Sequence, residues 1–271
     1  MADTALHTGK NLFLRALTRF SIPRLLAYLL ARLRGSHTSV VHGVAITFPI
    51  VAGTYYAFGR VRGAPWKEPA TQRWLEGIAE DHPGAVLWDV GANIGLFTLL
   101  AGRMGLNVVA FEPLLTSQHL LQLSIPLNGL ERSIISIPIG LSHRTSATDF
   151  YIRSARAGIS GSSIGVNAGK SQYHVTTLSM SGDDVRNVLP NRFCSPTAIK
   201  LDVDGIELQI LEGLRDTLAL QSLQHIMVEE AEHEAHVASV LAPHGFKLTH
   251  EENTTPRHPG MLVNRYFARR G

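Results

Sequence analysis

The chain has 271 residues, enough to bury a full α/β core in one domain that carries an N-terminal extension. Its single cysteine, Cys194, excludes an internal disulfide and indicates a reducing compartment instead of a secreted scaffold. The formal net charge of +3 argues against a dedicated nucleic-acid-binding protein, so we expect no nucleic-acid partner.

The positive charge is concentrated at the N-terminus. Residues 1–67 carry nine Lys or Arg against one acid, Asp3, whereas residues 68–271 carry 16 basic and 21 acidic residues. We therefore divide the chain into a basic extension, 1–67, and a main domain, 68–271. Arginines interrupt every apolar run in residues 10–34, so none approaches the roughly 20 residues that span a bilayer. We expect a cytoplasmic protein whose extension forms a helix packed on the domain; the alternative is weak, peripheral association with an anionic membrane surface.

The segment between residues 35 and 84 contains turn residues and short apolar patterns. Residues 39–48 and 54–62 have a β-like pattern and are separated by Pro49 and Gly53, which predicts a small antiparallel lead-in. Residues 66–80 are predicted to form a helix that ends at His82-Pro83-Gly84.

From Val86 onward, strand and helix patterns alternate, and a β-rich insertion over residues 143–180 interrupts them. This alternation predicts an α/β fold with a mostly parallel, twisted sheet covered by helices on both faces, and a ligand site beyond the carboxyl ends of the strands. The predicted strands are 86–90, 108–111, 134–139, 197–203, 225–228, 246–250 and 262–268, and the predicted helices are 96–103, about 117–126, 207–218 and 232–242.

The run Asp89-Val-Gly-Ala-Asn-Ile-Gly95 is the most informative motif. It follows a fully apolar strand start and precedes a helix, so it predicts a tight turn where the backbone approaches a ligand closely. A second acid, Glu112, ends the next predicted strand and is followed by Pro113. Two acids after neighbouring strands are typical of a site for a nucleotide-like cofactor with a ribose.

Two classes of cofactor use such a turn. A dinucleotide site requires Gly-x-Gly-x-x-Gly, and its third glycine is missing here, while Asp89 would repel a pyrophosphate. A carboxylate suits the ammonium and sulfonium charges of S-adenosylmethionine, and Glu112 can accept hydrogen bonds from both ribose hydroxyls. The sequence therefore predicts S-adenosylmethionine, held by residues of the turn and of the following strand ends: Asp89, Gly91, Asn93, Gly95, Glu112, Pro113, Leu141 and Ser142.

A second acidic motif, Lys200-Leu-Asp-Val-Asp-Gly-Ile-Glu207, follows another buried strand. A carboxylate at such a position is costly unless it meets a cation, a donor or a ligand. Lys200 points to the same side of the strand as Asp202, either to serve the reaction or only to neutralise an acid. We predict Asp202, Lys200 and Glu229 as the catalytic residues, because aligned carboxylates can orient and deprotonate an acceptor hydroxyl.

Together these motifs resemble the FkbM-type family of S-adenosylmethionine-dependent methyltransferases. The resemblance is carried by residues 89–95, Phe111-Glu-Pro113, Asn128, the pair Ser162 and Ser163, residues 199–207 and Val228-Glu229. The chain departs from the family at Asp204, where Glu is commoner. The resemblance implies a Rossmann-like class I methyltransferase domain, S-adenosylmethionine as donor, and O-methylation of a hydroxyl on a sugar, polyketide or related small metabolite.

Three alternatives remain. His233-Glu-Ala-His236 is one residue too short for a zinc helix, so we predict no metal, although Asp202, Asp204 and Glu229 could bind Mg²⁺. A nicotinamide-dependent oxidoreductase is a weaker alternative. A catalytically degenerate methyltransferase fold that acts as a binding module is the non-enzymatic one.

Overall fold

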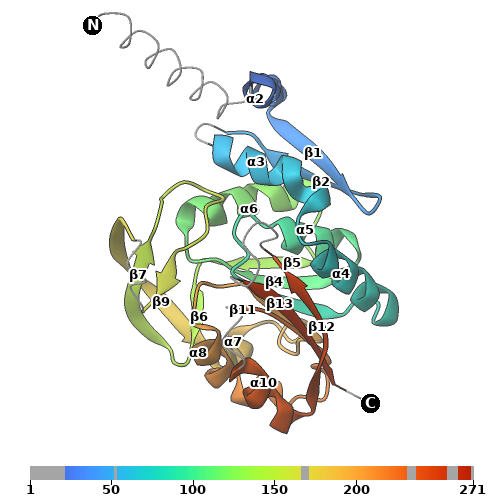
Figure 1. Cartoon of the computed structure of the whole chain (residues 1–271), viewed down its shortest axis with the longest axis vertical. Helices are drawn as coiled ribbons and strands as arrows, with labels where there is room; N and C mark the ends of the chain where they lie inside the picture. The colour runs from blue at the N-terminus through green and yellow to red at the C-terminus, as the bar shows by residue number, and fades with distance from the viewer. Residues whose placement is uncertain (1–21, 52–53, 166–170, 231–235, 255–261, 270–271) are drawn as a thin grey trace, which may run out of the picture.

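A computed structural model of the chain describes residues 22–51, 54–165, 171–230, 236–254 and 262–269. A seven-stranded sheet runs through the body of the molecule (Figure 1) in the order β12-β13-β11-β10-β3-β4-β5. All neighbouring pairs are parallel except the two that involve β13. The strands are β3 (Val86–Val90), β4 (Asn107–Phe111), β5 (Ile134–Ile137), β10 (Ala198–Leu201), β11 (His225–Glu230), β12 (Phe246–Asn253) and β13 (Val263–Arg269).

The predicted α/β fold with a mostly parallel sheet is confirmed. All five residues of β3 and all four of β10 are buried, because packed elements cover both faces of the sheet. Val86, Trp88 and Val90 join a hydrophobic cluster on one face, and Leu87 joins a second cluster on the other. Alternate residues of one strand therefore serve two separate layers of the core.

Helices and turns complete both layers. The first cluster includes residues of α7 (Gly182–Val188), α8 (Glu207–Glu212), α9 (Arg215–Leu218) and α10 (His236–Leu241). The second includes residues of α4 (Pro69–Asp81), α5 (Leu96–Arg103) and α6 (Leu115–Leu127). A short 3-10 turn, η2 (Ala242–His244), leads into β12.

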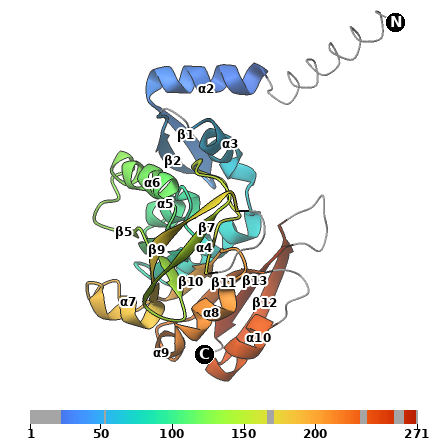
Figure 2. The same ribbon diagram turned by 90° about the vertical axis from the view of Figure 1, so that its left-hand side faces the viewer.

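The predicted β-rich insertion is also confirmed. It forms a four-stranded sheet in the order β6-β9-β7-β8, which lies to the left of the main sheet in Figure 1 and toward the viewer in Figure 2. Its strands are β6 (Gly140–Ser142), β7 (Ser146–Ile152), β8 (Ser163–Ile164) and β9 (Tyr173–Ser181).

The N-terminal extension packs on the second layer, except for its first described helix. That helix, α2 (Ile22–Arg34), lies across the end of the molecule (Figure 2). The hairpin β1 (Ser36–Val41) and β2 (Val44–Pro49), α3 (Tyr55–Gly63) and the 3-10 turn η1 (Ala64–Trp66) follow, and they share a hydrophobic cluster with α5 and β3. Asn128 fixes this arrangement, since its side chain pairs with both the N–H (2.8 Å) and the carbonyl (2.8 Å) of Thr47.

One predicted element of the extension is wrong. Residues 54–62 form the helix α3 instead of a strand, because Ala57, Phe58 and Val61 recur at helical spacing and are buried together. Aromatic and β-branched residues gave this segment its β-like pattern. The β character predicted for residues 39–48 is confirmed, but this segment folds back on itself as the antiparallel hairpin of β1 and β2 and has no strand partner in residues 54–62. The predicted helix 66–80 begins only at Pro69.

Several predicted boundaries differ from the structure. Gly140 begins β6 instead of ending the strand 134–139, which stops at Ile137. The predicted helix 207–218 divides into α8 and α9 at Gly213, where a Cβ atom would lie 2.1 Å from the carbonyl oxygen of Ser142. The predicted helical region at residues 10–21 and the first residues of the predicted helix 232–242 lie outside the described residues. None of the helices in the described part of the chain has the length and apolar character needed to cross a bilayer.

Candidate active site

A cavity of about 270 Å³ opens beyond the carboxyl ends of β3, β4 and β10. The strand order reverses between β3 and β10, and the crevice at such a reversal is the usual ligand site of an open α/β sheet. The cavity lining includes the turn after β3, the segments after β4 and β10, residues of the insertion and Glu229 of β11. Residues upstream of the main sheet also contribute: Arg60, Lys67 and Glu68.

Two glycines of the turn after β3, Gly91 and Gly95, lie too close to neighbouring atoms to carry a side chain. Gly91 has φ +83°, and a Cβ atom there would lie 2.0 Å from the carbonyl oxygen of Asp202. Gly95 has φ +87°, and its Cβ would lie 2.3 Å from the Leu121 side chain. Asn93 is also left-handed, at φ +52°, and its side-chain oxygen accepts a hydrogen bond from Ser117 (3.2 Å). Gly91 and Asn93 line the cavity, whereas Gly95 shapes the turn from outside the lining.

Glu112 lines the cavity, and backbone amides hold its carboxylate. Its carboxylate accepts hydrogen bonds from the N–H groups of Asn93 and Leu114, each at 2.7 Å. Burial outweighs these bonds and raises the pKa of Glu112 to about 7. The structure therefore places Glu112 where the sequence predicts it, beside the turn and facing the ligand space.

Asp89 is positioned differently from the prediction. It is not among the residues that line the cavity, because its side chain points toward α5. Thr98 donates to one carboxylate oxygen (2.5 Å), and the other lies 3.7 Å from Lys200 Nζ. Burial raises the pKa of Asp89. Asp89 thus lies behind the site and supports Lys200, its partner in the β3–β10 register, instead of facing the ligand space.

The three predicted catalytic residues lie together in the cavity lining. Lys200 Nζ donates to Asp202 (2.7 Å) and lies 5.0 Å from the centroid of the Phe97 ring. Burial opposes the charged form of Asp202, but the ammonium groups of Lys200 and Lys67 outweigh it and lower the pKa of Asp202 to about 2. Burial and the neighbouring Asp202 raise the pKa of Glu229 to about 7. One carboxylate is therefore ionised at neutral pH while the other exchanges a proton there.

Of the other predicted cofactor residues, some line the cavity and one does not. Pro113 and Leu141 line the cavity. Ser142 does not, because it is buried next to Gly213 and its hydroxyl lies 3.3 Å from His143 Nδ1. Asp204 also lines the cavity and accepts a hydrogen bond from the Gly161 N–H (2.8 Å), which ties the insertion to the segment after β10.

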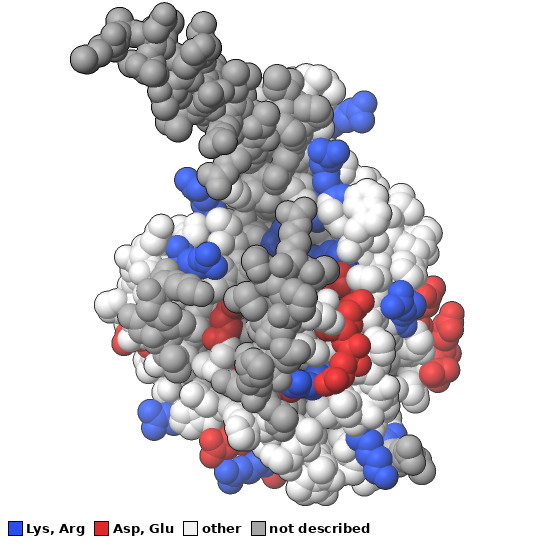
Figure 3. All heavy atoms as spheres, in the orientation of Figure 1, with Lys and Arg blue, Asp and Glu red and all other residues white. Residues whose placement is uncertain are grey.

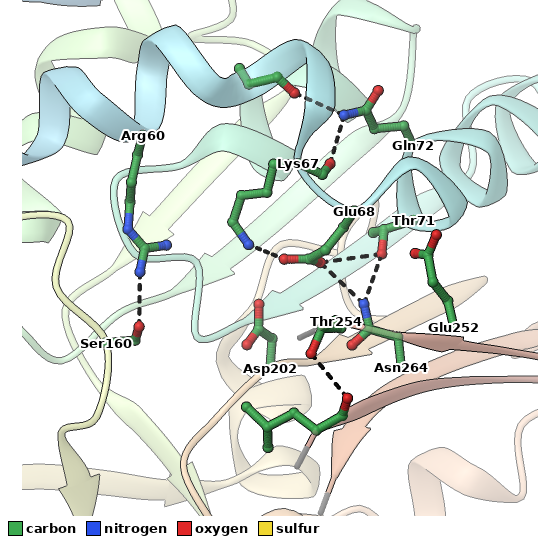
Figure 4. Close-up of polar contacts among 12 residues, drawn as sticks. Arg60, Lys67, Glu68, Thr71, Gln72, Ser160, Asp202, Glu252, Thr254 and Asn264 are labelled. Atoms are coloured by element: carbon green, nitrogen blue, oxygen red, sulfur yellow. Dashed lines mark hydrogen bonds and ion pairs between the residues drawn. The ribbon is translucent and has the colours of Figure 1, made fainter. Parts of the chain in front are cut away.

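The sequence did not predict that Arg60, Lys67 and Glu68 line the cavity. Arg60 comes from α3, and Lys67 and Glu68 precede α4, so all three lie outside the motifs (Figure 4). Glu68 is left-handed at φ +48° and pairs with Lys67, while Thr71 and Asn264 donate to its second oxygen at 3.3 and 3.2 Å. Only the surplus of basic residues in the extension could have indicated this contribution.

Across the part of the chain that the structure describes, no group of three or more His, Cys, Asp or Glu side chains is arranged to hold a metal ion. Residues 231–235, which include His233, lie outside that part.

The chain is similar to characterised methyltransferases. The profile of the methyltransferase FkbM domain matches residues 89–248. The hexuronic acid methyltransferase AglP of Haloferax volcanii is 29% identical over 170 residues, which make up 63% of this chain and 64% of that protein. The chain thus matches less than two thirds of the length of this relative.

Solved structures show more remote likeness. A tRNA m1G37 methyltransferase of M. jannaschii has a TM-score of 0.46 at 11% identity, covering 88% of this chain and 57% of that one. Magnesium protoporphyrin IX methyltransferase of Synechocystis, solved with bound SAM, also has a TM-score of 0.46 at 11% identity, covering 74% and 77%. Likeness at this level carries no argument about the substrate of the present chain.

Proposed function

The chain belongs to the FkbM methyltransferase family, and from that premise we propose that it transfers a methyl group from S-adenosylmethionine to a hydroxyl oxygen of an acidic sugar. The observation that carries the proposal is one cavity that joins the glycine turn and Glu112 to the pair Asp202 and Glu229. Family membership supports S-adenosylmethionine as the donor, as the sequence predicts.

The residues of the turn fit that donor. Gly91 allows the backbone to approach a ligand closely, because only a residue without Cβ is accommodated there. Glu112 can accept hydrogen bonds from two ribose hydroxyls, while its own backbone donors hold it in place. Pro113 and Leu141 add apolar lining beside it. When bound, S-adenosylmethionine supplies a methyl group attached to a positively charged sulfur, a good leaving group.

The acidic pair then serves the acceptor. Asp202 is ionised and held by Lys200, so it can accept a hydrogen bond from the acceptor hydroxyl and orient it. Glu229, with a pKa of about 7, can take up the proton at neutral pH. Glu229 would accept the proton of the acceptor hydroxyl, and the acceptor oxygen would take the methyl group that bound S-adenosylmethionine would supply, with the neutral thioether as the leaving group.

A sugar acceptor is supported by the relative whose name specifies a hexuronic acid. A sugar ring carries several hydroxyls, which suits a cavity lined by carboxylates and by the hydroxyls of Ser160, Ser162 and Ser163. The carboxylate of a hexuronic acid would additionally require a cation in the lining.

Two measurements test the proposal. Calorimetry with S-adenosylmethionine, with NAD as the control, should show binding of the first alone, and NAD binding alone would favour the oxidoreductase. Mass spectrometry after incubation with S-adenosylmethionine and a panel of glucuronate, galacturonate, glucose and a hydroxylated polyketide should detect a methylated uronate. Cofactor binding with no product from any acceptor would instead support the degenerate binding module.

A further inference from the structure

Two cationic side chains, Arg60 and Lys67, line the cavity, and they bind different polar partners. Lys67 pairs with the carboxylate of Glu68. Arg60 Nη2 donates to the hydroxyl of Ser160 (2.8 Å), a neutral partner from the insertion (Figure 4). Among the residues that the structure describes, no carboxylate lies within ion-pair distance of Arg60. A guanidinium has five N–H donors in a planar fork, so most of the donors of Arg60 remain for a ligand.

The electrostatic surroundings of Arg60 favour an added anion. Burial lowers the pKa of Arg60, and the more distant carboxylates, Asp202 and Glu229 first among them, only partly compensate. A ligand carboxylate at bonding distance would restore the stabilisation that burial removes, in the bidentate geometry that guanidinium and carboxylate share.

We propose that Arg60 binds a carboxylate group of a ligand in this cavity and so selects acidic ligands. The inference rests on the proposed function, which supplies two sources of that group: the methionyl carboxylate of the donor and the carboxylate of a uronic acid acceptor. Arg60 lies outside the matched residues 89–248 and reaches the site from α3, where it bonds to Ser160 of the insertion.

The test compares each acidic ligand with a counterpart that lacks its carboxylate. In the Arg60→Gln variant, binding of S-adenosylhomocysteine is measured by calorimetry beside that of its decarboxylated analogue, S-adenosyl-3-thiopropylamine, which keeps the ammonium group. The uronate arm compares glucuronate with glucose as competitors or acceptors. We expect about ten-fold or greater weakening for one acidic ligand, little change for its neutral counterpart, and partial rescue by Arg60→Lys.

The two arms identify the source, and a matched variant controls for the fold. Arg62→Gln lies on the same helix but is exposed and absent from the lining, so it should bind every ligand normally. Equal loss for acidic and neutral ligands in Arg60→Gln, or no loss for either acidic ligand, would overturn the assignment. Because the donor arm needs no turnover, it gives a result even if the proposed acceptor chemistry fails.

A separate observation concerns α2, which exposes a leucine face. Leu25, Leu26, Leu29, Leu30 and Leu33 are 44–86% exposed, with Leu33 the most exposed. At about 100° per residue they occupy one sector of about 140°, which Arg32 and Arg34, both exposed, flank on either side. Tyr28 and Ala31, on the opposite side, pack against Ile50 and Phe58. A helix docked by one narrow face thus presents a wide apolar face outward.

The positive charge around α2 indicates which kind of surface its leucine face would contact. Residues 4–67 contain no Asp or Glu, and in the view of Figure 3 the end of the molecule around α2 shows Lys and Arg without Asp or Glu among the coloured residues. Apolar residues flanked by arginines are typical of helices that lie in the surface of an anionic bilayer. We infer that α2 docks the protein on an anionic membrane surface.

Vesicle sedimentation tests this inference with the full chain. We expect the wild type to sediment with phosphatidylcholine vesicles that contain phosphatidylglycerol and much less with phosphatidylcholine alone, and added salt should weaken binding. Leu30→Ser with Leu33→Ser should lose most of the binding, whereas Leu248→Ser, a similarly exposed leucine on β12, should not. Equal sedimentation of the double variant and the wild type would refute it, as would a stable dimer by analytical ultracentrifugation that the double variant abolishes.

Discussion

The two halves of the cavity are built in different ways. The half that we propose for the cofactor consists of residues close in sequence, the turn after β3 and Glu112 after β4, and backbone contacts hold them. The half that we propose for the acceptor brings together Ser160 of the insertion, Asp202 after β10 and Glu229 of β11, and Arg60 of α3 reaches the same cavity. Short-range geometry therefore determines the donor site, while the acceptor site depends on how distant elements pack. Changes in the two halves should affect different steps.

The largest effect is expected in the cofactor half, from Gly91→Ala. The added Cβ meets the backbone of Asp202 at 2.0 Å, and φ +83° is strained for any side chain. We expect a loss of about 3 kcal/mol or more in the free energy of unfolding, together with loss of S-adenosylmethionine binding. Chemical denaturation and calorimetry measure these two quantities.

Gly105→Ala is the matched control for that change. Gly105 has φ +96° but nothing within 4 Å of a Cβ atom, so it isolates backbone strain of about 1–2 kcal/mol from the clash. If both substitutions lowered the free energy of unfolding equally, the clash of the added Cβ atom with Asp202 would contribute nothing to the loss.

The next effect tests the acceptor half. Asp202→Asn keeps the size of the side chain and removes its charge, so turnover should fall about 10²-fold or more while S-adenosylmethionine affinity stays within a few-fold. Steady-state kinetics with a uronate acceptor measures the first, and calorimetry measures the second. If the loss were confined to donor binding, Asp202 would belong to the cofactor half and Glu229 alone would remain as the proton acceptor.

Glu112→Ala should give a smaller effect, confined to the cofactor half. It removes the predicted acceptor for the ribose hydroxyls and should weaken S-adenosylmethionine binding by about 1.5–3 kcal/mol. Turnover at saturating donor should change much less. Unchanged donor affinity in a folded variant would refute the ribose assignment.

The same contrast explains what the sequence predicts and what it does not. Buried strands with a single acid at their ends, as at Asp89 and Asp202, give a strong local signal, and β3 and α5 match their predicted bounds. The orientation of those acids depends on tertiary packing. Asp89 faces Thr98 and Lys200 because it alternates onto the α5 side of the sheet, whereas Asp202 lies one residue beyond β10 and lines the cavity.

Long-range contacts account for the remaining errors. The helix α3 was given a strand pattern by its aromatic residues, and its true face is defined only by the cluster that it shares with β2 and α5. For the same reason Arg60 was not predicted, since no local spacing links it to Ser160, one hundred residues away. The sequence therefore predicts site residues most accurately where they all lie in one short segment of the chain.

The smallest expected effect is on the pH dependence of the free energy of unfolding, to which Glu112 of the proposed cofactor half contributes. Burial raises the pKa of Glu112 to about 7, so between about pH 4.5 and 7 the folded protein binds more protons at this group than the unfolded chain does. The free energy of unfolding must then fall as pH rises through that window. Glu112→Gln should flatten this slope by on the order of 1–3 kcal/mol, measured by denaturation at several pH values.

Donor binding should act on the same proton. Ribose hydroxyls that donate to Glu112 favour its ionised form, so binding of S-adenosylmethionine near pH 6.5 should release up to about 0.7 proton per molecule in the wild type and less in Glu112→Gln. Calorimetry in buffers of different ionisation enthalpy measures this release. Glu207 and Glu229, whose pKa values are also raised to about 7, retain their own contributions in the variant, so only the difference between the two proteins reports on Glu112. If the release were the same in both proteins, the proton would come from a group other than Glu112, and the assignment of Glu112 to the ribose hydroxyls would be refuted.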